Sequence, residues 1–352
     1  MKIASIIGAR PQFIKSSVIS SEIAERNGIS EVVIHTGQHF DNNMSDIFFE
    51  ELGLSKPKYN LNINQMSYHK IINKMTHSIK NIILREEING VMVYGDTNST
   101  LAGSLAASIL SLPIFHVEAG LRSFNRDMAE ERNRIITDHL SSLLFCPNKN
   151  AVKNLSKEKI NKGVIHSGDI MYDSFLKFTK KDKTHFEAQN EIKFILATIH
   201  RSENISSIDK LSNIFKNLDK IHKEIKIIMP LHPHTKKKMD EFSINSNVEF
   251  IEPVGYISML SLLKNCNLVI TDSGGLQKES YFAKKQCITV RSQTEWIELI
   301  EKDHNVLCEP QNIYEQFKRK IHLNKEFVPN IYGDGNSCKI IVDSIVSYFE
   351  RK

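Results

Sequence analysis

The stretch that decides the fold is VMVYGDTNSTLAGSLAASILSLPIFHVEAGLRSFNRDMAEERNRIITDH, residues 91–139. It contains two short runs of β-branched and aromatic residues, 91–94 and 113–117, separated by a segment, 98–110, of helical composition and spacing. The pattern predicts a strand, a helix and a second strand. A crossover of this length makes the strands parallel and right-handed, so their carboxyl ends lie at one edge of the sheet.

Three carboxylates follow these apolar runs or begin a helix: Asp96, Glu118 and Glu131. Open α/β sheets bind ligands outside the carboxyl ends of their strands, where helix N-termini supply donors for anions. We therefore expect Asp96 and Glu118 to share a crevice. The arginines nearby, which could compensate the charge of paired carboxylates, are Arg122, Arg132 and Arg134.

A purely structural interpretation of the same acids stays open. Asp96, followed by Thr97 and Asn98, could cap the helix that begins there. A glutamate in the first turn of a helix, as Glu130 or Glu131 would be, complements the helix dipole.

Length and composition indicate an ordinary globular protein. A chain of 352 residues exceeds what one core usually holds, so two domains are expected. Charged residues make up 25% and hydrophobic residues 41%. The net charge of +5 suits an anionic small substrate. The sequence has no basic stripe interleaved with aromatic residues, so nucleic acid is not an expected partner.

The cysteines and the lengths of the apolar runs indicate in which cellular compartment the protein resides. Five cysteines occur without CxxC spacing, four of them in or beside apolar runs, which predicts buried thiols in a reducing environment. The apolar run at the start, MKIASIIGARPQ, is too short for a signal peptide. No stretch reaches the ~18 apolar residues of a membrane span. We expect a cytoplasmic protein with no membrane partner.

Strands and helices alternate along both halves of the chain, which predicts two doubly wound, Rossmann-like α/β domains facing a central cleft. The first domain is expected at residues 1–177, with the C-terminal helix, residues 337–352, packing back on it. The second is expected at residues 191–336. A polar interval at 178–190 separates them and is the predicted linker.

Glycine-rich and basic residues follow several predicted strands. Arg10 and Lys15 lie in GARPQFIK after the first strand, and SGGLQKE, residues 273–279, begins a helix in the second half. Two glycines allow close backbone approach to a phosphate, and Glu279 could hold ribose hydroxyls. A structural role, a glycine turn followed by a helix N-cap, explains residues 273–279 equally well. Neither GxxxxGK[ST] nor GxGxxG occurs, which disfavours an NTPase or a nicotinamide cofactor.

Two histidine motifs also follow strands, HRSEN at residues 200–204 and HPH at residues 232–234. Their spacing matches neither HExxH nor a Cys/His finger, so no metal site is expected. Structural histidines remain an alternative. His200 beside Arg201 is the stronger candidate for function, because adjacent cations at a strand edge suit a pyrophosphate.

These motifs, in this order, resemble the non-hydrolysing UDP-N-acetylglucosamine 2-epimerase family, which includes the epimerases of UDP-2,3-diacetamido-2,3-dideoxyglucuronate. The residues that carry the resemblance are GARPQFIK, HTGQHFDNNMS, YGDTNSTLAG, HVEAGLRSFN, EERNRIITDH, HRSEN, TDSGG and YGDG. They cover almost the full length. Ala129, where the family usually has proline, and Ser202 depart from its pattern, and neither is a proposed acid.

The resemblance implies a glycosyltransferase-B-like fold, a homodimer, no cofactor and a UDP-linked amino sugar as substrate. It implies that UDP is held mainly by the second domain and that the sugar faces the first. Acid and base roles fall to Asp96, Glu118 and Glu131, with His200 at the pyrophosphate. The implied substrate contacts are Arg10, Lys15, Arg122, Arg201, Tyr256, Ser273, Gly274, Gly275, Glu279 and Arg291.

The chemistry leads to the same reaction class. Inverting a sugar carbon that bears an acetamido group, with no adjacent carbonyl and no redox cofactor, is possible if UDP is eliminated and added back. Asp96 is our choice of base, although the sequence does not assign abstraction and return among the three acids. The alternatives are an epimerase that releases UDP, a glycosyltransferase of the same fold, and an inactive nucleotide-sugar binding protein.

Overall fold

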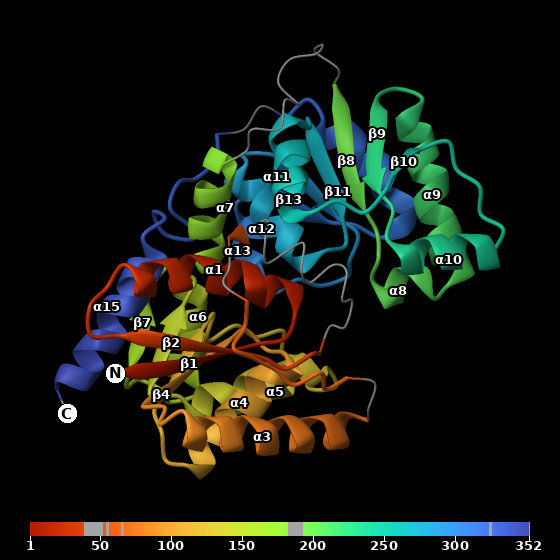
Figure 1. The fold of residues 1–352 in the computed structure, drawn as a ribbon. Coiled ribbons are helices and arrows are strands. Elements are labelled where there is room, and N and C mark those ends of the chain that lie inside the picture. Colours follow the sequence, from red (N-terminus) through yellow and green to blue (C-terminus); the bar gives the residue numbers. More distant parts are fainter. Residues whose placement is uncertain (39–51, 54–55, 65–66, 182–192, 324–325, 352) are drawn as a thin grey trace. The chain divides into compact units, whose positions relative to one another are not determined.

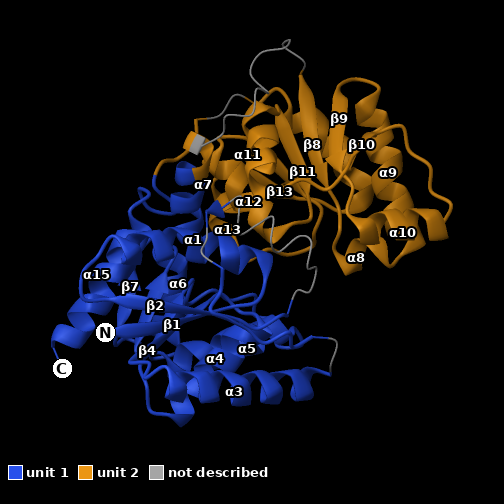
Figure 2. Cartoon of the chain, in the orientation of Figure 1, with its two compact units in different colours: residues 1–177, 330–352 blue, residues 178–329 orange. Residues whose placement is uncertain are grey.

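The computed structural model describes residues 1–38, 52–53, 56–64, 67–181, 193–323 and 326–351. The chain divides into two compact units (Figure 2). Unit 1 comprises Met1–Lys177 and Asn330–Lys352, and unit 2 comprises Phe178–Pro329. Each unit is built on one parallel sheet with helices on its faces (Figure 1). The α/β fold class predicted from alternating strands and helices is confirmed.

The sheet of unit 1 has the order β3-β2-β1-β4-β5-β6-β7, and its strands pair in parallel. The strands are β1 Lys2–Ile7, β2 Ser30–His35, β3 Tyr59–Asn60, β4 Gly90–Tyr94, β5 Ile114–Val117, β6 Leu143–Cys146 and β7 Val164–His166. The order reverses between β1 and β4. Such a switch point leaves a crevice outside the carboxyl ends of the two strands.

The helices of unit 1 bury apolar residues in its core, except for Ala129–Leu140, whose buried residues are all polar. The helices are α1 Arg10–Ala24, α3 Tyr68–Arg85, α4 Asn98–Ile109, α5 Ala129–Leu140, α6 Lys149–Lys157, α7 Ile170–Lys181 and α15 Ser337–Glu350. In α3, Ile71, Met75 and Ile79 recur at helical spacing and are buried in a cluster that includes Ile6 and Val93. Near its start, Tyr68 donates to Asn133 of α5 at 2.6 Å.

The sheet of unit 2 has the order β10-β9-β8-β11-β12-β13 and is also parallel. Its strands are β8 Phe194–Thr198, β9 Lys226–Pro230, β10 Glu249–Ile251, β11 Leu268–Thr271, β12 Gln286–Thr289 and β13 Asn305–Leu307. Its helices are α8 Ser202–Ile205, α9 Ile208–His222, α10 Pro233–Glu241, α11 Tyr256–Asn265, α12 Gly274–Phe282, α13 Ile297–Glu301, η1 Pro310–Asn312 and α14 Ile313–Lys320. The switch point here lies between β8 and β11.

The boundaries of the units differ from those expected in two places. Helix α7 continues to Lys181, past the expected start of the linker at residue 178, and residues 182–190 of the predicted interval lie outside the described part of the chain. Residues 330–336 belong to unit 1, where the Asp169 amide donates to the Tyr332 carbonyl at 2.9 Å. Helix α15 also belongs to unit 1 and contacts α1.

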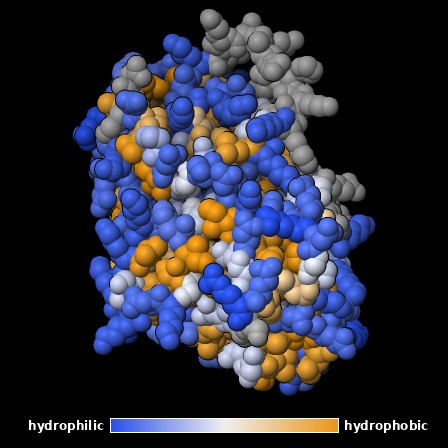
Figure 3. Space-filling view, turned by 90° about the vertical axis from the view of Figure 1, so that its left-hand side faces the viewer, coloured by the Kyte–Doolittle hydropathy of each residue, from blue (hydrophilic) through white to orange (hydrophobic). Residues whose placement is uncertain are grey.

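The surface shown in Figure 3 is mostly hydrophilic, with hydrophobic side chains in scattered groups. Among the described residues, no helix is both long and apolar enough to cross a membrane. The cysteines are free thiols. Four of them are buried, as predicted: Cys146, Cys266, Cys287 and Cys308.

One buried side chain, Gln12 of α1, joins the turn after β1 to the turn after β4. Its Oε1 accepts hydrogen bonds from the Gly8 and Ala9 amides at 2.8 and 3.1 Å. Its Nε2 donates to the Tyr94 carbonyl at 2.8 Å and to Thr97 Oγ1 at 2.9 Å. Both sides of the switch point in unit 1 are therefore held by one amide.

Gln12→Ala should lower the free energy of unfolding by about 1–3 kcal/mol, because it leaves buried backbone groups without partners. The matched control is Gln311→Ala, at an exposed glutamine, which should change stability by no more than about 0.5 kcal/mol. Equilibrium unfolding in urea measures both. Equal stability of the two variants would contradict this role for Gln12.

Candidate active site

The first pair of site residues lies at the carboxyl edge of β1, β4 and β5. Lys15 of α1 and Glu118, directly after β5, form a salt bridge of 2.6 Å between Nζ and Oε1. Both side chains are largely buried. A Cβ on Gly95 would lie 3.4 Å from Glu118 Oε1 and 3.6 Å from Lys15 Nζ, so the turn after β4 reaches the same place. The structure thus brings α1 and the turns after β4 and β5 together here.

Asp96, the residue after Gly95, pairs with Arg134 of α5. The Arg134 guanidinium donates from NH2 to Asp96 Oδ2 and from NH1 to Glu131 Oε2, the latter at 3.1 Å. Thr97, rather than Asp96, caps α4, because its side chain accepts from the Thr100 amide. The capping interpretation of Asp96 is therefore wrong.

The electrostatic environment shifts the proton affinity of Asp96. Burial raises the pKa of its carboxyl above the ordinary value of 3.8, and the negative charge of Glu118 raises it further. The charges of Arg134 and Lys15 oppose this shift. The pKa of Asp96 therefore responds to the Lys15–Glu118 pair as well as to Arg134, and a carboxyl with a raised pKa is suited to exchange protons with a substrate.

Glu131 is held differently from the other two acids. Its carboxylate is buried and accepts hydrogen bonds from the Ser123 amide and hydroxyl at 2.8 and 2.9 Å and from the Phe124 amide at 2.9 Å. With Arg134 this makes four donors around one carboxylate. Glu131 consequently fixes the loop that follows β5.

The structure does not bring Arg122 to this group. Its guanidinium donates to both oxygens of Glu158 at 2.7 Å and to Asp138 Oδ2 at 2.7 Å. These partners lie in a separate buried cluster, so the predicted role of Arg122 in substrate binding has no geometric support. Arg10 is the first residue of α1 and is partly exposed.

In unit 2, His200 and Arg201 are positioned by Asp272, a residue that the sequence analysis did not single out. The Asp272 carboxylate is fully buried directly after β11. It accepts hydrogen bonds from the amides of His200 at 3.1 Å and Arg201 at 2.9 Å, and from Asn204 Nδ2 at 3.0 Å. The His200 ring remains 39% exposed and stacks on His232, with ring centroids 5.7 Å apart.

The start of α12 gathers two arginines. Ser273 caps the helix, accepting from the Leu276 amide at 3.4 Å. A Cβ on Gly274 would lie 3.7 Å from Arg201 NH2 and 3.9 Å from Arg291 NH1. Within the described part of the chain, a Cβ on Gly275 would meet no heavy atom within 4 Å. The N-terminus of α12 therefore combines backbone donors with two guanidinium groups.

Arg291 has an unused donor. Its side chain is 4% exposed, and its NH1 pairs with Glu295 at 3.2 Å. Its buried Nε has no hydrogen-bond partner among the described residues. A buried donor of this kind is costly when it has no acceptor.

The two remaining predicted residues lie on neighbouring helices. Glu279 lies on α12 and is buried. Tyr256, the first residue of α11, is also buried and packs edge-on against Phe178 at 5.8 Å between ring centroids.

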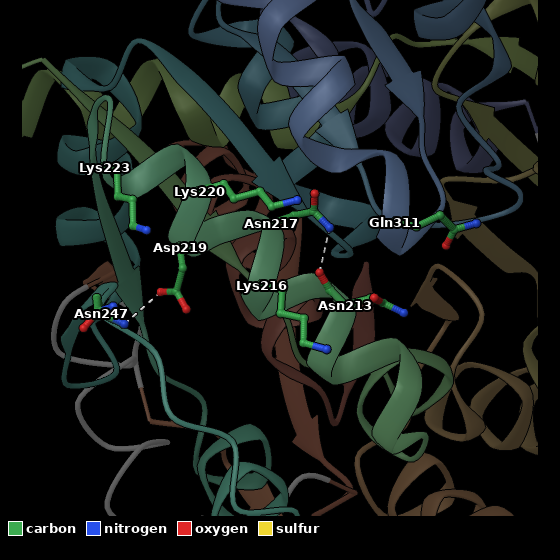
Figure 4. Close-up of a pocket in the computed structure, with 8 residues that line it drawn as sticks. All are labelled: Asn213, Lys216, Asn217, Asp219, Lys220, Lys223, Asn247 and Gln311. Carbon is green, nitrogen blue, oxygen red and sulfur yellow. Dashed lines mark hydrogen bonds between the residues drawn. The ribbon is translucent and has the colours of Figure 1, made fainter.

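A separate hollow of about 420 Å³ lies along α9 of unit 2 (Figure 4). It contains none of the predicted site residues. Its lining residues are Asn213, Lys216, Asn217, Asp219, Lys220, Lys223, Asn247 and Gln311. No group of three or more His, Cys, Asp or Glu that could hold a metal occurs within the described residues.

The sequence model of one protein family, UDP-N-acetylglucosamine 2-epimerase, matches residues 21–346. The chain belongs to this family. It is 44% identical to the UDP-2,3-diacetamido-2,3-dideoxy-D-glucuronate 2-epimerase of Pseudomonas aeruginosa, over 97% of this chain and 99% of that protein. It is 41% identical to the UDP-N-acetylglucosamine 2-epimerase of Methanocaldococcus jannaschii, over 97% and 98%. The epimerase family predicted from the motifs is confirmed.

Solved structures agree with this assignment. The crystal structure of the M. jannaschii epimerase in complex with UDP-GlcNAc and UDP superposes with a TM-score of 0.89 at 39% identity, covering 99% of this chain and 100% of that one. The Neisseria meningitidis enzyme bound to UDP-GlcNAc gives 0.88 at 31%, covering 99% and 100%. Acinetobacter baumannii MurG, at 12% identity and a TM-score of 0.58, shares the fold alone, over 98% and 99%. The fold is thus glycosyltransferase-B-like.

Arg134→Gln should raise the pKa of Asp96 further. The substitution removes a charge that lowers this pKa, while burial and Glu118, which raise it, remain. Carboxyl-carbon NMR titration measures the shift. The control is Arg132→Gln, at an exposed arginine on the same helix, which should leave the titration of Asp96 unchanged. An unchanged or lowered pKa in Arg134→Gln would show that Arg134 does not govern this acid.

Proposed function

We propose that this epimerase inverts carbon 2 of a UDP-linked 2-acetamido sugar without net hydrolysis, by eliminating UDP and adding it back. The observation that carries the proposal is the linked group of Asp96, Glu118, Lys15 and Arg134 at the switch point of unit 1. Two carboxylates that influence each other, one with a raised pKa, suit the removal and return of a proton.

Asp96 is the proposed base. Its carboxylate takes the proton from sugar carbon 2 while the bond between carbon 1 and the UDP oxygen breaks, which leaves a carbon–carbon double bond in the sugar. A carboxyl on the other face returns a proton to carbon 2, and the UDP oxygen attacks carbon 1 to restore the bond. Glu118 is the proposed partner that returns the proton, which its carboxylate receives from the Lys15 ammonium with which it is paired. Glu131 acts by fixing the loop at residues 123–124.

Unit 2 supplies the proposed UDP contacts. The α12 N-terminus, with Ser273, Gly274 and Gly275, would hold a phosphate together with Arg201 and Arg291. His200, exposed at the end of β8, would stabilise the negative charge of the departing diphosphate. Glu279, further along α12, would hold the ribose hydroxyls. Arg10, at the start of α1, and Tyr256, at the start of α11, are further proposed contacts.

Two relatives support two versions of the substrate, with either unmodified N-acetylglucosamine or its diacetamido-glucuronate analogue attached to UDP. The same proposal includes a cytoplasmic location, supported by free cysteines, and a homodimer. Size-exclusion chromatography with light scattering tests the dimer.

Asp96→Asn and Glu118→Gln should each reduce turnover about a hundredfold or more while retaining UDP binding, because each removes one proton-transfer group. Turnover is followed by NMR in heavy water with each UDP-sugar supplied separately, and deuterium should enter carbon 2 with the wild type. Glu130→Gln is the control, since this exposed glutamate precedes Glu131 in α5 and should leave turnover unchanged.

The same spectra discriminate among the alternatives. Stoichiometric, irreversible release of UDP would indicate a hydrolysing epimerase. Absence of deuterium at carbon 2, with product formed only when an acceptor is added, would indicate a glycosyltransferase. Near-normal turnover in both acid variants would refute the proposed site.

Arg291→Gln should weaken UDP binding about tenfold or more, which corresponds to about 1.4 kcal/mol, because it removes a buried cation at the α12 N-terminus. Titration calorimetry with UDP measures the dissociation constant. Arg319→Gln, at an exposed arginine of α14, serves as the control and should bind UDP like the wild type. Unchanged affinity in Arg291→Gln would remove this arginine from the proposed site.

A further inference from the structure

Asp138 of α5 contacts the chain on both sides of Glu118. Its Oδ1 lies 2.7 Å from His116 Nδ1. Its Oδ2 accepts from the Gly120 amide at 3.2 Å and from Arg122 NH1 at 2.7 Å. One carboxylate therefore contacts His116, which precedes Glu118, and Gly120 and Arg122, which follow it.

The turn that Asp138 holds has an unusual backbone. Glu118 has a φ of 71°, in the left-handed region that residues with a side chain seldom adopt. Gly120 follows with a φ of 79°. The amides of Glu118 and Ala119 both donate to the Phe145 carbonyl, at 3.1 and 3.0 Å. The direction of the Glu118 side chain thus depends on contacts that keep this turn in place.

His116 extends the same connection to the neighbouring strand. Its Nε2 lies 2.8 Å from the carbonyl oxygen of Gly95, the residue before Asp96. A carbonyl oxygen can only accept a hydrogen bond, so Nε2 is a donor. The ring is completely buried, and within the described residues its two nitrogens face these two oxygens.

Asp138 Oδ2 accepts from the Arg122 guanidinium at 2.7 Å and from the Gly120 amide at 3.2 Å, the donors that an ionised carboxylate takes. Burial would raise the pKa of its carboxyl, but the positive charges of His116 and Arg122 and their hydrogen bonds keep it below the ordinary value. An ionised carboxylate accepts from Nδ1, so both ring nitrogens of His116 donate and the ring is an imidazolium. The charges of this cluster then balance, because the two cations His116 and Arg122 pair with the two carboxylates of Asp138 and Glu158.

We infer that Asp138 and His116 are positioning residues for the two acids of the proposed function, on which this inference rests. Asp138 fixes the turn that directs Glu118, and the His116 imidazolium ties that turn to the backbone that precedes Asp96. Neither residue contacts substrate in this assignment. Their effect is exerted through the placement of Glu118 and Asp96.

The test compares Asp138→Asn with Asp173→Asn. Asp173 is also a buried carboxylate of unit 1, and it accepts from the Cys338 amide at 2.8 Å, away from both acids. An amide at position 138 that keeps its oxygen for Gly120 and Arg122 presents a donor to His116 Nδ1, so it pairs only with a neutral ring and loses the charge-assisted bond that holds the turn. We expect kcat to fall at least tenfold in Asp138→Asn with KM within about twofold of the wild type. Asp173→Asn should retain the wild-type kcat, and thermal unfolding of both variants separates this effect from lost stability.

A second measurement does not depend on activity. Nitrogen NMR of ¹⁵N-histidine-labelled protein should show both ring nitrogens of His116 protonated in the wild type and in Asp173→Asn, and a neutral ring in Asp138→Asn. A neutral His116 in the wild type, or equal kcat in the two variants, would overturn the inference. If the wild type turns over neither UDP-sugar, the proposed function fails, and the histidine spectra still decide whether the imidazolium link exists.

Discussion

The pairing of buried charge at the carboxyl edge of the unit 1 sheet is the constraint on which the proposed site depends. Carboxylates taken out of water are tolerated when cations and hydrogen bonds compensate them. Lys15 of α1 compensates Glu118, and Arg134 of α5 compensates Asp96 and Glu131. Glu118 and Asp96, which follow strands, are therefore each held by a helix. The site exists only when α1, α5 and the loops after β4 and β5 are all in place, so catalysis and folding of this unit are coupled.

The same constraint separates two kinds of charged residue that look alike in the sequence. Arg122 and Arg134 lie twelve positions apart, and both are buried among acids. Arg122 donates to Asp138 and Glu158, whereas Arg134 donates to Asp96, the proposed base. Charge alone does not distinguish an arginine that stabilises a loop from one that adjusts a proton-transfer group. The hydrogen-bond partners do.

The sequence predicted those features that follow from periodicity and strand direction. Parallel strands bring their carboxyl ends to one edge, so Asp96, Glu118 and Lys15 could be grouped from the order of strands and helices alone. A strand of two residues such as β3 carries no measurable period and is held by its neighbour β2, so pattern analysis does not predict it.

Side-chain partners could be predicted less well than strand edges. Glu131, Arg134 and Asp138 share one face of α5, at spacings of three and four, and this signal could have identified Arg134 and Asp138. Which acid pairs with Arg134 depends on loops that pattern analysis cannot place. Asp272 was missed for the same reason, since its partners His200 and Asn204 lie 72 and 68 positions away in the chain.

The backbone at Glu118 shows where function overrides local preference. The turns after β4 and β5 have three residues with left-handed φ near the acids: Gly95 at 63°, Glu118 at 71° and Gly120 at 79°. Glycine adopts this conformation at little cost, and a residue with a side chain held in a sparsely populated region gives up on the order of 1–3 kcal/mol. Two of the three positions are glycine, and a third glycine would relieve the strain at Glu118. It would also remove the carboxylate that pairs with Lys15. The hydrogen bonds to Asp138 and to Phe145 offset that strain, which explains why so much buried polar structure surrounds a single turn.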